Sequence, residues 1–196
     1  GKTFRDDFYP EYKANRIDAP KPFHFSNIDA YLRKHYPVID CRGIEADDAI
    51  SIRAWGGWES DDDPYSNPSN VVCSADKDLN QIPGWHYSFT SGELYYVTLE
   101  EAERWLWSQV ITGDSVDNIP GIKGLGKKKA EQLLGDSSDP YTMYTNILNK
   151  EIKNRWGEFV ITPEHIYRTG KLVYILRYPD DSWENYCAEN KIDIPS

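Results

Sequence analysis

The sequence predicts an α/β fold in which a parallel-sheet core, residues 1–97, is followed by a helical region, residues 98–196. A short β-branched run at 70–73 ends in acidic residues, as a buried parallel strand does where its end opens into a site. Two aromatic runs follow it around a Ser-Gly turn. Beyond residue 98 the spacing is mainly helical, and no obvious flexible linker separates the two regions.

Composition limits the classes of protein that fit. The chain has 196 residues and 39% hydrophobic content, enough for one large domain or two small ones. No apolar run approaches the roughly 18 residues of a membrane span, and residues 1–10 contain no secretory apolar stretch, so we expect a cytoplasmic protein. The three cysteines are widely spaced, and the four histidines lack metal-ligand spacing, which argues against disulfides and a zinc cluster.

Two helices are expected before the first strand. Residues 26–36 have the spacing of a short amphipathic helix, with Ser26 as its capping residue. A brief extended stretch and a turn at Gly43 then lead into a helix from about residue 46 to residue 55.

A polar loop, a strand and a hairpin follow. Residues 56–70 are rich in Gly, Pro, Asp and Ser, and their three consecutive aspartates are typical of a solvated loop, because the EF-hand glycine and glutamate are missing. The run at 70–73 predicts a buried parallel strand, and residues 85–98 predict a two-stranded hairpin.

The second half is expected to be helical. Thr98 and Glu101 form a capping box that opens a helix at 99–111. Three more helices are predicted at 126–134, at about 140–154 and at 163–176. Thr162 caps the last of these, and Pro163 fits its first turn.

Three acidic clusters fall at predicted element boundaries. Each alone is more simply explained by helix capping or by solvent-facing charge, but three such clusters together favour a shared metal site. Converging carboxylates repel one another, and hard divalent cations relieve that repulsion. Two cations held by Asp and Glu are the arrangement that hydrolyses phosphodiesters. The candidate ligands are Glu45, Asp47, Asp48, Asp76, Asp78, Asp114 and Asp117.

A glycine-punctuated stretch followed by three lysines predicts a phosphate-binding turn. The net charge of −10 argues against a protein that coats nucleic acid through bulk electrostatics. A helix-turn-helix with exposed backbone amides and lysines can nevertheless hold a phosphate without reading sequence. The alternative is an αα-hairpin whose lysines only solvate a helix. The residues concerned are Gly121, Gly124, Gly126, Lys127, Lys128 and Lys129.

Four motifs together resemble the bacteriophage and bacterial flap endonucleases, the 5′-3′ nuclease family related to the 5′-nuclease domain of DNA polymerase I. They are FRDDFYPEYKANR, GIEADDAI, SADKDLNQI and ITGDSVDNIPGIKGLGKKKAEQLL, in the family's order over residues 4–134. The resemblance implies a PIN-like or Rossmann-like nuclease core. It is followed by a helix-three-turn-helix region that binds duplex DNA.

The resemblance also implies residue roles. The seven acids look like ligands of two Mg²⁺ or Mn²⁺ ions, and the loop from Gly121 to Gly126 looks like one that binds DNA through a potassium ion. Lys13 and Arg16 look like the basic pair that grips the scissile phosphate of a substrate with a 5′ flap, a nick or a 5′ end. A lysine and an arginine beside a metal site can neutralise charge that develops on phosphate.

Two departures from the family pattern shape the expectation. The segment between Arg16 and Glu45 is shorter than the family's usual arch, so flap preference stays open. The sequence also starts after the point at which the family has contributed its first strand and two further metal-binding aspartates. We therefore expect weak or absent cleavage by this chain alone, and activity when a complementary N-terminal segment is supplied. The alternative is a DNA-junction binding protein with an incomplete metal site.

Overall fold

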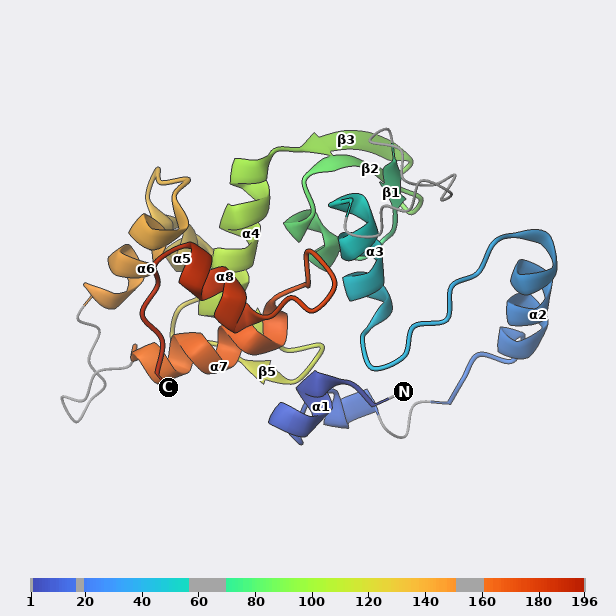
Figure 1. Cartoon of the computed structure of the whole chain (residues 1–196), viewed down its shortest axis with the longest axis horizontal. Coiled ribbons are helices and arrows are strands. Elements are labelled where there is room, and N and C mark those ends of the chain that lie inside the picture. The colour runs from blue at the N-terminus through green and yellow to red at the C-terminus, as the bar shows by residue number, and fades with distance from the viewer. Residues whose placement is uncertain (1, 17–19, 57–69, 151–160, 196) are drawn as a thin grey trace.

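The computed structural model describes residues 2–16, 20–56, 70–150 and 161–195 and shows a mixed α/β fold. A small sheet lies at one side of the molecule, and a long central helix leads from it to a group of helices (Figure 1). Most of the polar loop expected at 56–70 lies outside the described residues. None of the described helices is long and apolar enough to cross a membrane.

The sheet has three strands in the order β1-β2-β3. Strand β1 (Val71–Cys73) pairs parallel with β2 (Gly84–Ser88), which pairs antiparallel with β3 (Glu93–Val97), confirming the hairpin. Of the predicted parallel sheet, the described strands form one parallel pair, β1 with β2. The expectation that β1 is a buried strand is wrong, because β1 lies at the edge of the sheet formed by the described strands and only its Val72 is buried.

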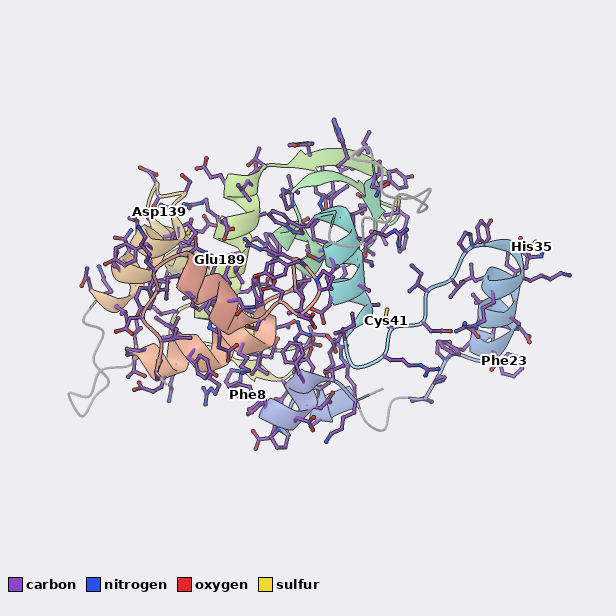
Figure 2. The ribbon with its side chains drawn as sticks, in the orientation of Figure 1. Phe8, Phe23, His35, Cys41, Asp139 and Glu189 are labelled. Carbon is purple, nitrogen blue, oxygen red and sulfur yellow. The ribbon has the colours of Figure 1, made fainter. Side chains whose placement is uncertain are left out.

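The N-terminal region contains three α-helices and a short 3-10 turn: α1 (Phe4–Phe8), η1 (Ala14–Arg16), α2 (Phe25–His35) and α3 (Ala46–Ala54). The start predicted for α3 is confirmed. The cap predicted at Ser26 is wrong, because α2 begins one residue earlier and His24 is its N-cap. No residue of α2 is buried, and His35 at its end and Phe23 just before its start lie away from the rest of the molecule (Figure 2).

The helical region starts with α4 (Leu99–Thr112), whose Thr98–Glu101 capping box forms as predicted. A short two-stranded turn, β4 (Gly113–Asp114) and β5 (Ile119–Pro120), then leads to the remaining helices. These are α5 (Lys127–Leu134), α6 (Pro140–Leu148), α7 (Pro163–Val173) and α8 (Trp183–Glu189).

Helix ends and α8 differ from the sequence prediction. Helix α6 reaches its C-cap at Asn149, earlier than the end expected near 154, and α7 stops at Val173. Thr162 and Pro163 open α7 as predicted. Helix α8 was not predicted, although Ser182 caps it through a hydrogen bond from the backbone of Asn185.

One hydrophobic cluster spans both halves of the chain. Trp107 and Trp183 are fully buried at its centre, and Tyr12 and Ile52 from the first half belong to the same cluster. Burial of large aromatic side chains is the main source of stability in a core of this kind. The shared core fixes the N-terminal segment and α3 against α4 and α7, and this packing brings the acidic segments together.

Candidate active site

Acids from three separate segments line one open cleft of about 820 Å³. Asp47 comes from the first turn of α3, Asp76 and Asp78 from the segment after β1, and two more acids from the β4–β5 turn. The cleft contains most of the predicted site residues: Lys13, Arg16, Asp47, Asp76, Asp78, Asp114, Asp117 and Lys127. Asp47 and Asp117, which are 70 positions apart in the sequence, therefore line the same cleft, as predicted.

The acids in the cleft raise one another's pKa values. Partial burial, with the charges of Asp76 and Asp114, raises the pKa of Asp78 to about 7. Partial burial, with the charges of Asp76 and Glu45, raises the pKa of Asp47 to about 6. Carboxylates in such a setting resist ionisation until a cation compensates their charge. The cleft is therefore a region of concentrated, incompletely compensated negative charge.

Local backbone contacts set the spacing of these acids. Asp76 accepts a hydrogen bond from the backbone N–H of Asp78 at 3.0 Å, and Asp114 accepts one from Val116 at 2.7 Å. Gly113 pairs with Pro120 across β4 and β5, and the next residue, Gly121, lies so close to the end of α4 that a Cβ on it would overlap the backbone of Thr112. This close approach holds the turn that carries Asp114 and Asp117 against the end of α4.

Two cations from the N-terminal segment reach the acidic wall. Lys13 Nζ lies 2.6 Å from Glu45 Oε1 and 3.4 Å from Asp117 Oδ2, and Arg16 Nη2 lies 2.5 Å from Asp117 Oδ1. Lys13 has a positive φ of 53°, a rare conformation for lysine, and its N–H donates to the Asp117 carbonyl at 2.9 Å. The predicted basic pair thus faces the predicted acids.

Two members of the predicted ligand set lie behind the cleft. Glu45 accepts a hydrogen bond from the Tyr12 hydroxyl at 3.0 Å and lines a small inner cavity of about 30 Å³ with Asp47 and Asp78. Asp48 is fully buried, and its two oxygens accept from Arg5 at 2.7 and 2.8 Å.

The structure therefore does not place Asp48 with the other candidate ligands. Its carboxylate also accepts the backbone N–H groups of Glu45 at 3.0 Å and Leu176 at 3.2 Å. A carboxylate with these four donors is saturated, and its negative charge is neutralised by a guanidinium. Sequence analysis did not identify Arg5. This residue lies within the motif FRDDFYPEYKANR, but no pattern of neighbouring residues indicates that it pairs with Asp48.

The chemistry of the cleft suits hard divalent cations. Every candidate donor in it is a carboxylate oxygen, the ligand type that Mg²⁺ and Mn²⁺ prefer. Within the described ranges, no three Asp, Glu, His or Cys side chains already converge as a preformed metal cluster.

The glycine-lysine stretch forms the predicted turn and helix. Gly124 has a φ of 85°, and Gly126 is the N-cap of α5. The three lysines diverge around the helix. Lys127 lines the acidic cleft with its Nζ 5.1 Å from the Trp105 ring centroid, whereas Lys129 Nζ donates to the Gly124 carbonyl at 2.8 Å.

Comparison with known proteins agrees with this geometry. Residues 1–104 match the family described as 5′-3′ exonuclease, N-terminal resolvase-like domain. DNA polymerase I of Rhizobium leguminosarum is 35% identical over 167 residues, which are 79% of this chain and 16% of the polymerase. This chain belongs to the 5′-3′ exonuclease family. DNA polymerase I of Chloroflexus aurantiacus is 32% identical over 153 residues, 68% of this chain and again 16% of the relative.

Solved structures of two bacteriophage nucleases share the fold. The T5 5′-exonuclease with bound zinc ions has a TM-score of 0.66 and 21% identity, covering 97% of this chain and 73% of the other. The bacteriophage T5 flap endonuclease in a complex with DNA and metal ions has a TM-score of 0.63 and 18% identity, covering 97% and 80%. The family's PIN-like nuclease fold is therefore the fold of this chain. The chain itself spans about a sixth of the length of the polymerases it matches.

Proposed function

We propose that this chain is the nuclease region of a structure-specific 5′ nuclease that hydrolyses DNA phosphodiesters at 5′ flaps, nicks or 5′ ends during replication or primer removal. The observation that carries the proposal is the single cleft in which five acids from three segments face Lys13 and Arg16. Family membership supports the reaction class. The all-carboxylate donor set supports a requirement for two Mg²⁺ or Mn²⁺ ions.

The residues of the cleft divide the work. Asp47, Asp76, Asp78, Asp114 and Asp117 hold the cations, with Glu45 behind them. When bound, the two ions supply positive charge that stabilises the attacking and leaving oxygens of an in-line displacement. Lys13 and Arg16 exchange their present carboxylate partners for the phosphate, which they orient and neutralise. The bound cations, Lys13 and Arg16 thereby stabilise the negative charge that develops on the phosphate during the reaction.

The turn before α5 is proposed to hold duplex DNA. Its Gly121–Gly126 backbone carbonyls are suitable ligands for a potassium ion, and Lys127, Lys128 and Lys129 are all exposed at the start of α5. Neutralising Lys128 and Lys129 should weaken binding to all sequences alike. The plot of log affinity against log salt should lose roughly 0.9 of slope per lost phosphate contact. An unchanged slope would assign these lysines to a solvated face.

The decisive test is cleavage of a labelled 5′-flap duplex in Mg²⁺, with the double variant Asp76→Asn, Asp78→Asn as the matched control. With the complementary N-terminal segment supplied, we expect the parent to cleave, and the double variant to lose cleavage while it binds DNA as well as the parent or more tightly, because repulsion of phosphate is reduced. Equal cleavage by both proteins would contradict the assignment of these acids. A parent that binds the junction without cutting it, even with that segment supplied, would favour a non-catalytic junction-binding protein.

A further inference from the structure

A buried glutamine beneath the cleft has its amide orientation set by the backbone. Gln81 is 4% exposed and lies at the end of the short 3-10 helix η2 (Asp78–Gln81). Its Nε2 donates to the Val173 carbonyl at 2.8 Å, and its Oε1 accepts the Ile175 N–H at 3.3 Å. A carbonyl can only accept and an N–H can only donate, so the two ends of this amide cannot be exchanged.

Gln81 in turn fixes the orientation of the amide of a second glutamine, Gln109 on α4. Gln81 Nε2 also donates to Gln109 Oε1 at 2.7 Å, which fixes the oxygen of Gln109 on that side. The amide nitrogen of Gln109 must then face the other way, where it donates to Asp78 Oδ1 at 2.8 Å. A chain of defined direction thus runs from the backbone after α7 through two neutral amides to an acid of the cleft.

We propose that Gln109, oriented by Gln81, is a positioning residue that holds Asp78 for cation binding. This inference rests on the proposed function, in which Asp78 is a metal ligand. The direction of this chain of hydrogen bonds follows from its donors and acceptors alone.

The physical value of a neutral donor at this place lies in charge and geometry. Asp78 is repelled by Asp76, Asp114 and Asp117, so without a donor its side chain would tend to turn away from them. An arginine or lysine in the place of Gln109 would hold the carboxylate but would repel a cation. An amide holds one oxygen without adding charge and leaves the other oxygen to a metal ion. Partners of metal ligands typically act in this way.

The test measures Mn²⁺ affinity in the absence of DNA by calorimetric titration of the folded chain. Gln109→Met keeps the length of the side chain and removes the donor. We expect the Kd for Mn²⁺ to rise by about 10–100-fold and kcat for flap cleavage to fall, with KM for DNA little changed. Asn185→Leu, at an exposed position on α8, is the matched control for loss of an amide and should leave all three quantities unchanged.

Two further variants separate the possible failures. Asp78→Asn should weaken Mn²⁺ binding at least as much as Gln109→Met. If Asp78→Asn weakens it and Gln109→Met does not, the positioning role is overturned while the proposed function stands. If Asp78→Asn also binds Mn²⁺ like the parent, the metal assignment of Asp78 is wrong, and the inference falls with it.

The role of Gln81 has its own readout. If Gln81 acts through Gln109, then Gln81→Met should weaken Mn²⁺ binding in the parent but add little in the Gln109→Met background. Independent, additive losses would overturn the orientation step. Should Gln81→Met fail to fold, the exchange Gln81→Glu, which retains an acceptor for Ile175, gives the same comparison.

Discussion

Two neighbouring aspartates on α3 have opposite surroundings. Asp48 points into the body, where Arg5 and two backbone N–H groups saturate both of its oxygens. Asp47 points into the cleft, where the charges of other acids and partial burial raise its pKa to about 6. Neighbouring residues of the same type thus differ in whether the fold itself compensates their charge. The contrast separates a structural carboxylate from one that is left to bind something else.

The same contrast holds for the cations that approach Glu45. Arg5 is buried and lies 3.9 Å from Glu45, with its nitrogens committed to Asp48 and to the carbonyls of Leu172 and Tyr174. Lys13 is partly exposed and lies 2.6 Å from Glu45 at the wall of the cleft. Glu45 therefore lies between the interior, where hydrogen bonds and ion pairs compensate the buried charges, and the acidic cleft.

The largest expected effect comes from breaking the Arg5–Asp48 pair. Asp48→Ala leaves a buried guanidinium without its partner and should lower the free energy of unfolding by about 3–5 kcal/mol. The matched variant Asp47→Ala removes a repelled charge and should leave stability unchanged or increased. Urea unfolding of both variants measures the difference. Equal losses would show that the two aspartates are not distinguished by their surroundings.

Lys13→Ala tests the cleft side of the boundary. We expect turnover of a 5′-flap substrate to fall by about 10²-fold, because charge aimed at the developing negative phosphate is lost, while affinity for the duplex changes much less. Stability should stay close to that of the parent, in contrast to Arg5→Met, which leaves Asp48 unpaired inside the body. Single-turnover cleavage and binding isotherms separate the two quantities. Parallel losses of turnover and affinity would assign Lys13 to simple anchoring.

The β4–β5 turn links the body to the cleft, so its glycines should affect both. Gly121→Ala has no space for its Cβ beside Thr112 and should cost about 1–3 kcal/mol of stability and displace Asp114 and Asp117. Gly124→Ala meets no neighbouring atom but is strained by its φ of 85°, and should cost about 1 kcal/mol. Thermal unfolding of the two variants ranks them, and the reverse order would contradict the close approach.

Local structural features could be predicted from the sequence, whereas contacts between side chains far apart in the sequence could not. The capping box at Thr98, the Thr162 cap and the hairpin are local patterns, and the structure contains all three. The division of labour between Asp47 and Asp48 was not predictable, because the partner of Asp48 lies 43 residues away and only packing brings it there.

The hydrogen-bond chain through Gln81 and Gln109, and helix α8, were likewise not predictable from local sequence patterns. Gln81 and Gln109 have no distinctive spacing, and their roles follow from a backbone segment 92 residues beyond Gln81. Helix α8 is short and begins after an irregular stretch, so its Ser182 cap could not be recognised without the core that it packs against. Acid clusters at element boundaries were nevertheless sufficient to predict which segments meet at the cleft.

The smallest expected effect is the contribution of two buried histidines to the pH dependence of stability. Burial lowers the pKa of His86 and of His165, and the ring Nε2 of His86 lies 2.8 Å from the Ile82 carbonyl, to which it must donate. Between the lowered pKa and the ordinary value near 6.5, the unfolded chain binds more protons than the folded one. The stability that these two histidines contribute is therefore fully present above about pH 6.5 and is lost as the pH falls below it.

Each histidine can contribute no more than about 1.4 kcal/mol per pH unit to this loss. His86→Gln removes one titrating group, so between pH 6.5 and pH 5 its free energy of unfolding should fall less steeply, or rise more steeply, with falling pH than that of the parent, even if the variant is less stable at pH 8. Urea unfolding at a series of pH values in chelator gives the slope without contributions from bound cations. A slope identical to that of the parent would show that His86 accepts its proton in the folded state as readily as in the unfolded chain.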